Sequence, residues 1–432
     1  MSTSTRWMVR LALVVSISFR TTAHCQAGDN VSTKLEEYLK QGQLSDVEKY
    51  LTGQLTTDPQ HDQARFALGV VKVLSAIEHL GQEQYQYGAM SGQLANLPVF
   101  RLPLPVNPNP EEVTYTQVRQ VFLHLQTRML AAEAELAQVD LKREVKLPID
   151  LLSIRLDLNG DGKTDDKESF ATLFGVANRV RPGTPAVDLK VTFDNGDVPW
   201  LRGYCHFLCA VCDVVLAYDH QRMFDVSGHL IYPKAVPPRG GLEPLDVGAQ
   251  GNGDFARQIM DAVAAIHLAD FPLKEPKRMS SAREHLLEMI RTSRESWRLI
   301  EAETDNEQEW LPNPKQTGVL RVPVTREFID GWHGVLTEME DLIEGRKLVP
   351  FWRDYSGSFF FSGLGSNIPA TGRGVNLKQF FEEPPRFDLV LLIQGTAALP
   401  YVEKGPLSRP ETWDNLTRVF QGQFFGFAIW FN

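Results

Sequence analysis

Apolar residues in the N-terminal part of the chain recur at steps of three and four, which predicts a series of short amphipathic helices. Gly42 suits the end of a first helix, and Asp58-Pro59 stops a second helix that begins at Leu44. A third helix is predicted from about His61. Its apolar face is formed by Phe66, Val70, Val73 and Ile77.

Longer helices are predicted in the middle and the second half of the chain. One runs from about Glu111 to Val145, and a second, from Trp200 to Asp219, is apolar on nearly every side and so is expected to be buried. A capping box at Ser281-x-x-Glu284 begins a third, and a fourth lies between Thr325 and Gly345. The face of the first helix is formed by Val118, Phe122, Leu125, Met129, Ala132, Leu136 and Val139.

Few segments have the pattern of strands. Residues 191–193 are a candidate strand, and the tail alternates apolar runs at 359–361 and 389–393 with glycine-rich turns. The sequence therefore predicts a mainly α fold with a small β element in the C-terminal third.

A proline-rich stretch at residues 98–110 is the predicted boundary between two units. The first unit, residues 28–97, contains the helical hairpins. The second, residues 111–432, is a larger helical domain. The prolines of the linker are Pro98, Pro103, Pro105, Pro108 and Pro110.

The first 27 residues have the composition of a secretory signal peptide. Arg6 and Arg10 flank the start of a short apolar run at residues 11–19, and Ala23 or Ala27 offers a cleavage position. The run is too short to span a bilayer, and no other stretch reaches that length. We therefore expect a secreted or periplasmic protein without an integral membrane segment in the mature chain.

The chain of 432 residues has a formal net charge of -10 and no cluster of Lys or Arg, which makes nucleic acid an unexpected partner. Its four cysteines are too few and too closely placed for a disulfide framework, because Cys205, Cys209 and Cys212 share one short stretch and Cys25 lies near the signal peptide.

Residues 157–168 bring oxygen-bearing side chains together at the spacing that calcium requires. Side-chain oxygens come at alternate positions, a glycine occupies the sixth position, and a glutamate that can bind with both oxygens closes the loop. The residues expected to bind the ion are Asp157, Asn159, Asp161, Lys163 through its carbonyl, Asp165 and Glu168. The stretch resembles the loop of an EF-hand, which implies one Ca²⁺ ion.

The surroundings of this loop favour a structural site over a sensor. Pro148 shortens or removes the incoming helix, and no second loop of the pattern follows. The resemblance implies that Thr164, at the eighth position, would bridge to a partner loop, and none is visible. The acidic stretches at residues 194–197 and 301–309 do not fit the pattern.

Residues 34–80 resemble a tetratricopeptide repeat over about one and a half repeats. Val47 and Gln54 depart from the small residues of that motif. The resemblance implies a helical hairpin that binds another protein. The matching positions are Gly42, Leu51, Leu55, Asp58, Pro59, Ala64, Leu68 and Gly69.

Two other stretches contain residues that could bind a metal ion or act in catalysis. Cys205, Cys209 and Cys212 have the spacing with which radical S-adenosylmethionine enzymes bind an iron–sulfur cluster. A zinc site formed by His206, Cys209 and Cys212 is a second interpretation, and packing of the cysteines in the core is the third. Asp219-His220, near Asp213 and Asp225, could act as a general base or form a hydrated helix end.

These patterns lead to two hypotheses of function. The first is an exported calcium-binding helical protein that acts as a scaffold or interaction module, with calcium in a structural role. The alternative is an exported hydrolase with a scattered active site and structural calcium. No Walker lysine, nucleophile elbow or His-Glu-x-x-His motif is present in the sequence.

Overall fold

The computed structural model describes residues 31–90, 102, 104–177, 189–236, 252–355 and 368–409. Several sequence predictions lie outside these residues: the signal peptide 1–27 with Ala23 and Ala27, part of the linker 98–110, and the apolar run 359–361. Those predictions stay predictions.

The fold is mainly α, as the sequence predicts. Residues 31–41 are helical and turn at Gly42 into the next helix. The further helices are α2 (Leu44–Thr57), α3 (Asp62–Gln86), α4 (Tyr115–Leu136), α5 (Phe170–Ala177), α6 (Asp197–Ala217), α7 (Gln221–Ser227), α8 (Asn252–Leu268), α9 (Lys277–Ile300), α10 (Arg326–Ile343), α11 (Leu377–Glu382) and α12 (Leu389–Gln394). Short 3₁₀ helices are η2 (Leu151–Ser153), η3 (Asp166–Glu168), η4 (Gly228–Leu230) and η5 (Thr396–Tyr401).

The β structure is confined to short strands. A three-stranded antiparallel sheet in the C-terminal third, in the order β6-β7-β9, confirms the small β element predicted there. The predicted strand at 191–193 is also present and pairs in antiparallel register with β2. The strands are β1 (Val113–Thr114), β2 (Leu147–Asp150), β3 (Lys190–Phe193), β4 (Ala235–Val236), β5 (Asp270–Phe271), β6 (Val349–Pro350), β7 (Thr371–Val375), β8 (Phe387–Asp388) and β9 (Val402–Pro406).

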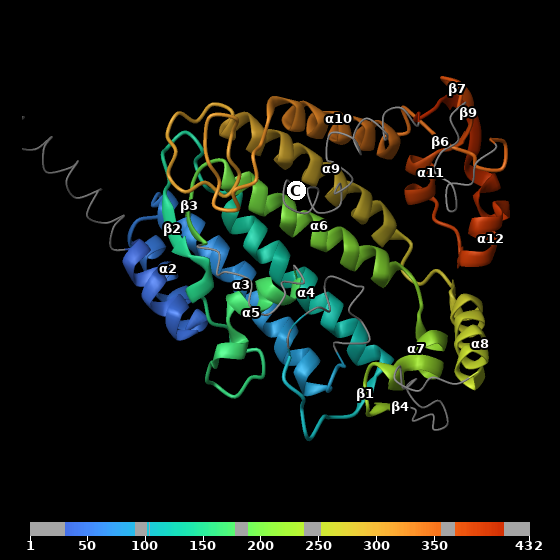
Figure 1. Cartoon of the computed structure of the whole chain (residues 1–432), viewed down its shortest axis with the longest axis horizontal. Helices are drawn as coiled ribbons and strands as arrows, with labels where there is room; N and C mark the ends of the chain where they lie inside the picture. Colours follow the sequence, from blue (N-terminus) through green and yellow to red (C-terminus); the bar gives the residue numbers. More distant parts are fainter. Residues whose placement is uncertain are drawn as a thin grey trace, which may run out of the picture.

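Helices α3, α4, α6, α9 and α10 lie side by side in chain order (Figure 1). One hydrophobic core extends from residue 31 to residue 216 and so includes helices on both sides of the proline-rich stretch. A second core joins α9 to α10 around the buried Trp297 and Trp332. The division of the chain at residues 98–110 stays a prediction, and the packing brings the two sides into direct contact.

Two helix boundaries differ from the predicted ones. The helix predicted to reach Val145 ends at Leu136, because the chain bends there to bring Val139 and Val145 into the core. Asp62 of α3 holds this bend by accepting the Asp140 N–H at 3.0 Å. Helix α9 begins at Lys277, four residues before the predicted capping box at Ser281.

Helix α6 is the one helix of the described residues that is long and apolar enough to cross a membrane by length and composition. Half of its apolar window is nevertheless buried inside the protein, between α4 and α9. That is the environment of a core helix. The described residues therefore contain no clear membrane-spanning segment.

Candidate functional site

The predicted calcium loop is preceded by strand β2 and the 3₁₀ turn η2 rather than by a helix. It ends in the turn η3, and α5 follows from Phe170. Two glycines allow the tight winding, since Gly160 and Gly162 have φ values of +73° and +78°, in the left-handed region that other residues rarely adopt. The loop is also closed at its base, where Leu156 N–H donates to the Glu168 carbonyl at 2.9 Å.

Side chains at the predicted ligand positions accept hydrogen bonds from the loop backbone. Asp157 accepts N–H groups from Gly160 at 2.8 Å and from Gly162 at 2.9 Å. Asn159 accepts the Asp161 N–H at 2.8 Å, and Asp161 accepts the Lys163 N–H at 2.8 Å. These hydrogen bonds hold the side-chain oxygens against N–H groups of the loop itself.

Glu168 is the most buried residue of this set, with only 2% of its surface exposed. Its Oε1 accepts N–H groups from Leu158 and Asn159 at 3.1 and 3.2 Å, and its Oε2 accepts the Asp165 N–H at 3.1 Å. Burial, together with the negative charges of Asp165 and Asp157, raises the pKa of the Glu168 carboxyl. A bound cation would offset that repulsion.

The carboxylates of the loop do not converge on a single point. Among the described residues, the three-residue groups whose ligand atoms all lie within 4.8 Å of one another are His79 with Glu83 and His124, and Asp194 with Glu303 and Glu309. Calcium binding at residues 157–168 therefore requires several oxygens to leave their backbone N–H partners and turn toward the ion.

The loop is attached to two neighbouring elements. On α3, the Gln82 amide donates to the Asp157 carbonyl at 2.8 Å and the Glu78 carboxylate accepts the Asp157 N–H at 2.7 Å. On the first hairpin, Gly42 lies so close to Thr164 that a Cβ there would collide with the threonine side chain. Thr164, for which the sequence offers no partner, thus packs against the hairpin turn.

Glu78 is a feature of this site that sequence reasoning missed. Burial raises the pKa of its carboxyl to about 7, and the charges of Asp157 and Glu168 add to the effect. No local signal could have found it, because Glu78 and Asp157 are 79 positions apart, with the end of α3 and all of α4 between them.

A shallow open hollow of about 310 Å³ lies beside the loop. Asn159 and Gly160 form one edge, and the end of α3 and the proline-rich stretch form the others. Its remaining lining residues are Gln82, Tyr85, Gln86, Asn107, Asn109 and Glu111.

The three cysteines of α6 are free thiols buried in the core. Burial raises the pKa of Cys205 and of Cys212 to about 12, and that of Cys209 also lies well above its usual value. Protonated thiols are poor metal ligands at neutral pH. His206 points elsewhere, with its Nδ1 atom 3.0 Å from Nδ1 of His285. This arrangement favours packing over the iron–sulfur and zinc interpretations.

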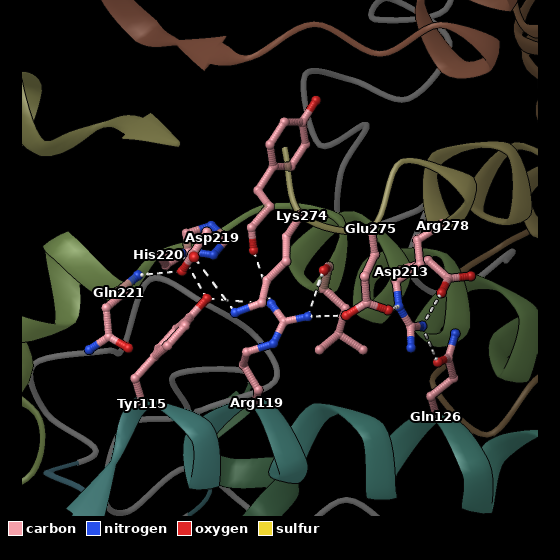
Figure 2. A network of polar contacts seen from close by, with 12 residues as sticks. Tyr115, Arg119, Gln126, Asp213, Asp219, His220, Gln221, Lys274, Glu275 and Arg278 are labelled. Atoms are coloured by element: carbon pink, nitrogen blue, oxygen red, sulfur yellow. Dashed lines mark hydrogen bonds and ion pairs between the residues drawn. The ribbon is translucent and has the colours of Figure 1, made fainter. Parts of the chain in front are cut away.

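The residues around His220 belong to a network of polar contacts between α4, α6 and α9 (Figure 2). Arg119, only 9% exposed, lies at its centre and donates to the carbonyls of Leu216 and Tyr218 at the end of α6, at 2.8 and 3.0 Å. A cation at a helix C-terminus satisfies carbonyls that lack partners within the helix. The network therefore fixes the end of α6 against α4.

His220 is not arranged as a general base with an orienting carboxylate. Its ring packs on Phe271 with centroids 4.2 Å apart, and burial, together with the charge of Arg119, lowers its pKa. Asp213 lies at the other end of the network, where it accepts from Arg278 at 2.8 Å (Figure 2). Asp225 accepts from the Gln221 amide at 2.6 Å. These pairings favour a structural role.

Asp194, Glu303 and Glu309 form a second group of carboxylates, in the turn after β3 and in the segment after α9. The two acidic stretches that do not fit the loop pattern in the sequence thus meet in the fold. Burial and the charge of Asp194 raise the pKa of Glu303 to about 8. Lys146 partly balances the group, since its Nζ lies 2.9 Å from both Asp305 and Glu307.

No family model matches this chain, and searches of the curated proteins and of the solved structures found no match.

Proposed function

We propose that this protein is an exported, calcium-binding helical scaffold in which the ion holds the N-terminal hairpins to the rest of the chain. The observation that carries the proposal is the tight turn in which Asp157 and Asn159 accept N–H groups of the loop around two left-handed glycines. Calcium takes six to eight oxygen ligands, and Asp165, Glu168 and the Lys163 carbonyl can complete the set.

A structural role follows from what the loop contacts. Arg155 N–H, just before the loop, donates to the Leu39 carbonyl of the first helix at 3.0 Å, and Thr164 packs on the turn at Gly42. On the other side, Gln82 and Glu78 connect the loop to α3. An ion that rigidifies residues 157–168 therefore stabilises three contacts with residues 31–90 at once.

The position of Thr164 also supports a clamp over a sensor. The EF-hand resemblance implies that the residue at the eighth position bridges to a second calcium loop, whereas Thr164 contacts a helical hairpin. The hairpin and α3 resemble a tetratricopeptide repeat, a type of surface that binds other proteins. We therefore propose that calcium sets the orientation of a protein-binding hairpin rather than opening a groove.

The proposed compartment matches the proposed site. The sequence predicts a signal peptide at residues 1–27, and outside the cytoplasm calcium sites with dissociation constants of about 10⁻⁴–10⁻³ M are sufficient. Such weak binding is compatible with a loop whose oxygens must first leave the backbone N–H groups of Gly160, Gly162 and Asp165.

Calorimetric titration with Ca²⁺ tests this function. The wild type should bind one ion, and Glu168→Gln should lose that binding because an amide cannot replace the bidentate carboxylate. Asp166→Asn is the matched control, since Asp166 is an acidic residue of the same loop that points outward, with 96% of its side chain exposed. Equal binding by the wild type and Glu168→Gln, or no binding by either, contradicts the proposal.

A further inference from the structure

His79, Glu83 and His124 form a compact group between α3 and α4. His79 and Glu83 are one helical turn apart on α3, so their side chains leave the same face, and His124 faces them from α4. Nδ1 of His124 lies 2.6 Å from Glu83 Oε1, and Nδ1 of His79 lies 3.3 Å from Glu83 Oε2. The two imidazole rings meet edge to face, with centroids 5.8 Å apart.

Two imidazoles and one carboxylate are a donor set that zinc uses when a fourth position is left to water. The three ligand atoms all lie within 4.8 Å of one another. With bonds near 2.1 Å, the ligand atoms of a tetrahedral zinc ion are separated by about 3.4 Å. His79 Nδ1 is already near this distance from Glu83 Oε2, at 3.3 Å, whereas His124 Nδ1 contacts the other oxygen, Oε1, at 2.6 Å. The His124 imidazole therefore has to shift for all three residues to bind one ion.

The group also contains an atom without a hydrogen bond. Glu83 Oε2 is buried, and its contact with His79 does not have hydrogen-bond geometry. A buried carboxylate oxygen that lacks a hydrogen-bond partner is costly, and a metal ion is one way to satisfy it. His124 is the exposed member, with 48% of its side chain accessible, so an ion and its water ligand can enter from that side.

The helices that carry the ligands form a rigid frame. Gly69 of α3 lies so close to Leu136 of α4 that an added Cβ would collide with it, and Leu80 and Leu125 are buried in the same core. Ligands held on packed helices keep their geometry better than ligands on loops. This frame differs from the calcium loop, whose ligands belong to a single turn.

The charges at the site suit a transition metal. The two imidazoles supply nitrogen donors, and Arg128 places a positive charge near His79. Arg128 also repels a cation, and Glu83 supplies the compensating negative charge. Nitrogen donors are poor ligands for calcium, so the two ions would not compete for this group.

We propose that His79, Glu83 and His124 bind a divalent transition-metal ion of the zinc class, which joins α3 to α4 and keeps one position open to water. The ion would lie on the side of α3 that faces α4. The calcium loop contacts the same helix through Glu78 and Gln82, each one residue before a proposed zinc ligand.

Titration of the full chain with Zn²⁺ against a chromogenic chelator tests this site, after metal removal with EDTA. The wild type should bind zinc with a micromolar or tighter dissociation constant, and His124→Ala should weaken binding by roughly 10–100-fold. His124 is exposed, so this substitution should leave the fold intact, which circular dichroism checks. Glu83→Gln should weaken binding in the same way.

Two controls make the result specific. His267→Ala removes another exposed histidine, on α8, and should leave the zinc affinity unchanged. Glu168→Gln, in the calcium loop, should also leave it unchanged. Co²⁺ should give the visible absorption bands of a tetrahedral site in the wild type and not in His124→Ala. The proposal is overturned if the wild type binds no zinc in this range, or if His124→Ala binds as tightly as the wild type.

Discussion

Carboxylates gather at two places in this protein, the loop Asp157–Glu168 and the cluster of Asp194, Glu303 and Glu309. In the loop, Asp157, Asp165 and Glu168 accept N–H groups from residues at most ten positions away, so local backbone dipoles stabilise their charges. In the cluster, side chains from separate segments lie together, and burial, with the negative charge of Asp194, raises the pKa of Glu303 to about 8. Local hydrogen bonds thus offset part of the burial of the loop carboxylates, whereas in the cluster Glu303 tends to hold a proton.

The loop and the cluster therefore accommodate acidic side chains in two different ways. Backbone N–H groups stabilise the charged form of a carboxylate, so the hydrogen bonds within the loop oppose the increase in pKa that burial causes at Glu168. Burial disfavours the charged form, so the cluster lowers its charge by protonation. Four substitutions test this comparison.

The largest effect is expected where the loop meets the hairpin. Gly42→Ala should destabilise the protein by about 2 kcal/mol, because φ is +66° at this residue and the new methyl group would collide with Thr164. Urea unfolding measures the loss. Gly53→Ala, on the exposed side of α2 with nothing near the added Cβ, should instead stabilise by about 0.5 kcal/mol. Equal effects of the two substitutions would falsify the contact between loop and hairpin.

The calcium-dependent part of stability should be smaller. At a calcium concentration ten times the dissociation constant, the ion should stabilise the wild type by about 1.4 kcal/mol. Glu168→Gln should remove this increment, and Asp166→Asn should keep it. Thermal unfolding with and without calcium measures both. A wild-type melting temperature that does not change when calcium is added would contradict the structural role of the ion.

The stability that the cluster contributes should depend on pH in the opposite sense to that of a salt-bridged carboxylate. The folded-state pKa of Glu303 is raised to about 8, above an unfolded value near 4.3, so the folded state retains a proton that the unfolded state has released. Stability from this group is therefore complete below about pH 4.3 and is lost as pH rises toward 8.

Glu303→Gln removes the group that titrates. At pH 8 it should stabilise the protein by about 1 kcal/mol, a value kept small because solvent partly screens the site. At pH 5 the gain should nearly vanish. Glu288→Gln on the surface of α9, where the side chain is 44% exposed, is the control and should change little. Urea unfolding at both pH values measures the effect, and a loss of stability at pH 8 would contradict the repulsion.

The smallest effect is expected at the cation beside the cluster. Lys146→Met removes the ammonium group that lies 2.9 Å from both Asp305 and Glu307, and should cost about 0.5–1 kcal/mol. Lys49→Met breaks an exposed pair with Asp46 and should cost almost nothing. The difference should shrink in high salt. A larger loss for Lys49→Met than for Lys146→Met would reverse the ranking of the two sites.

The sequence predicted what depends on neighbouring residues. Helix α10 begins after its predicted cap Thr325 and ends before Gly345, and the mainly α fold is confirmed. The calcium loop, which occupies twelve consecutive positions, stays a prediction. Helical periodicity also predicted the buried face of α4, from Phe122 to Leu136.

The sequence did not predict the features that depend on residues far apart in the chain. The end of α4 is decided by Asp62, which holds the bend at Asp140, and not by any local breaker. Glu78 reaches the loop, and Arg119 reaches the carbonyls of Leu216 and Tyr218, only because helices far apart in sequence pack together. Nothing in the sequence indicated that the two acidic segments, neither of which fits the calcium-loop pattern, would meet in the fold.

The contact between Gly42 and Thr164 has a consequence for the biosynthesis of the protein. The hairpin turn is made about 120 residues before the threonine that packs on it, which corresponds to roughly 6–24 s of translation. During that interval the nascent hairpin has neither its covering loop nor, if the chain is exported, the ion that stiffens it.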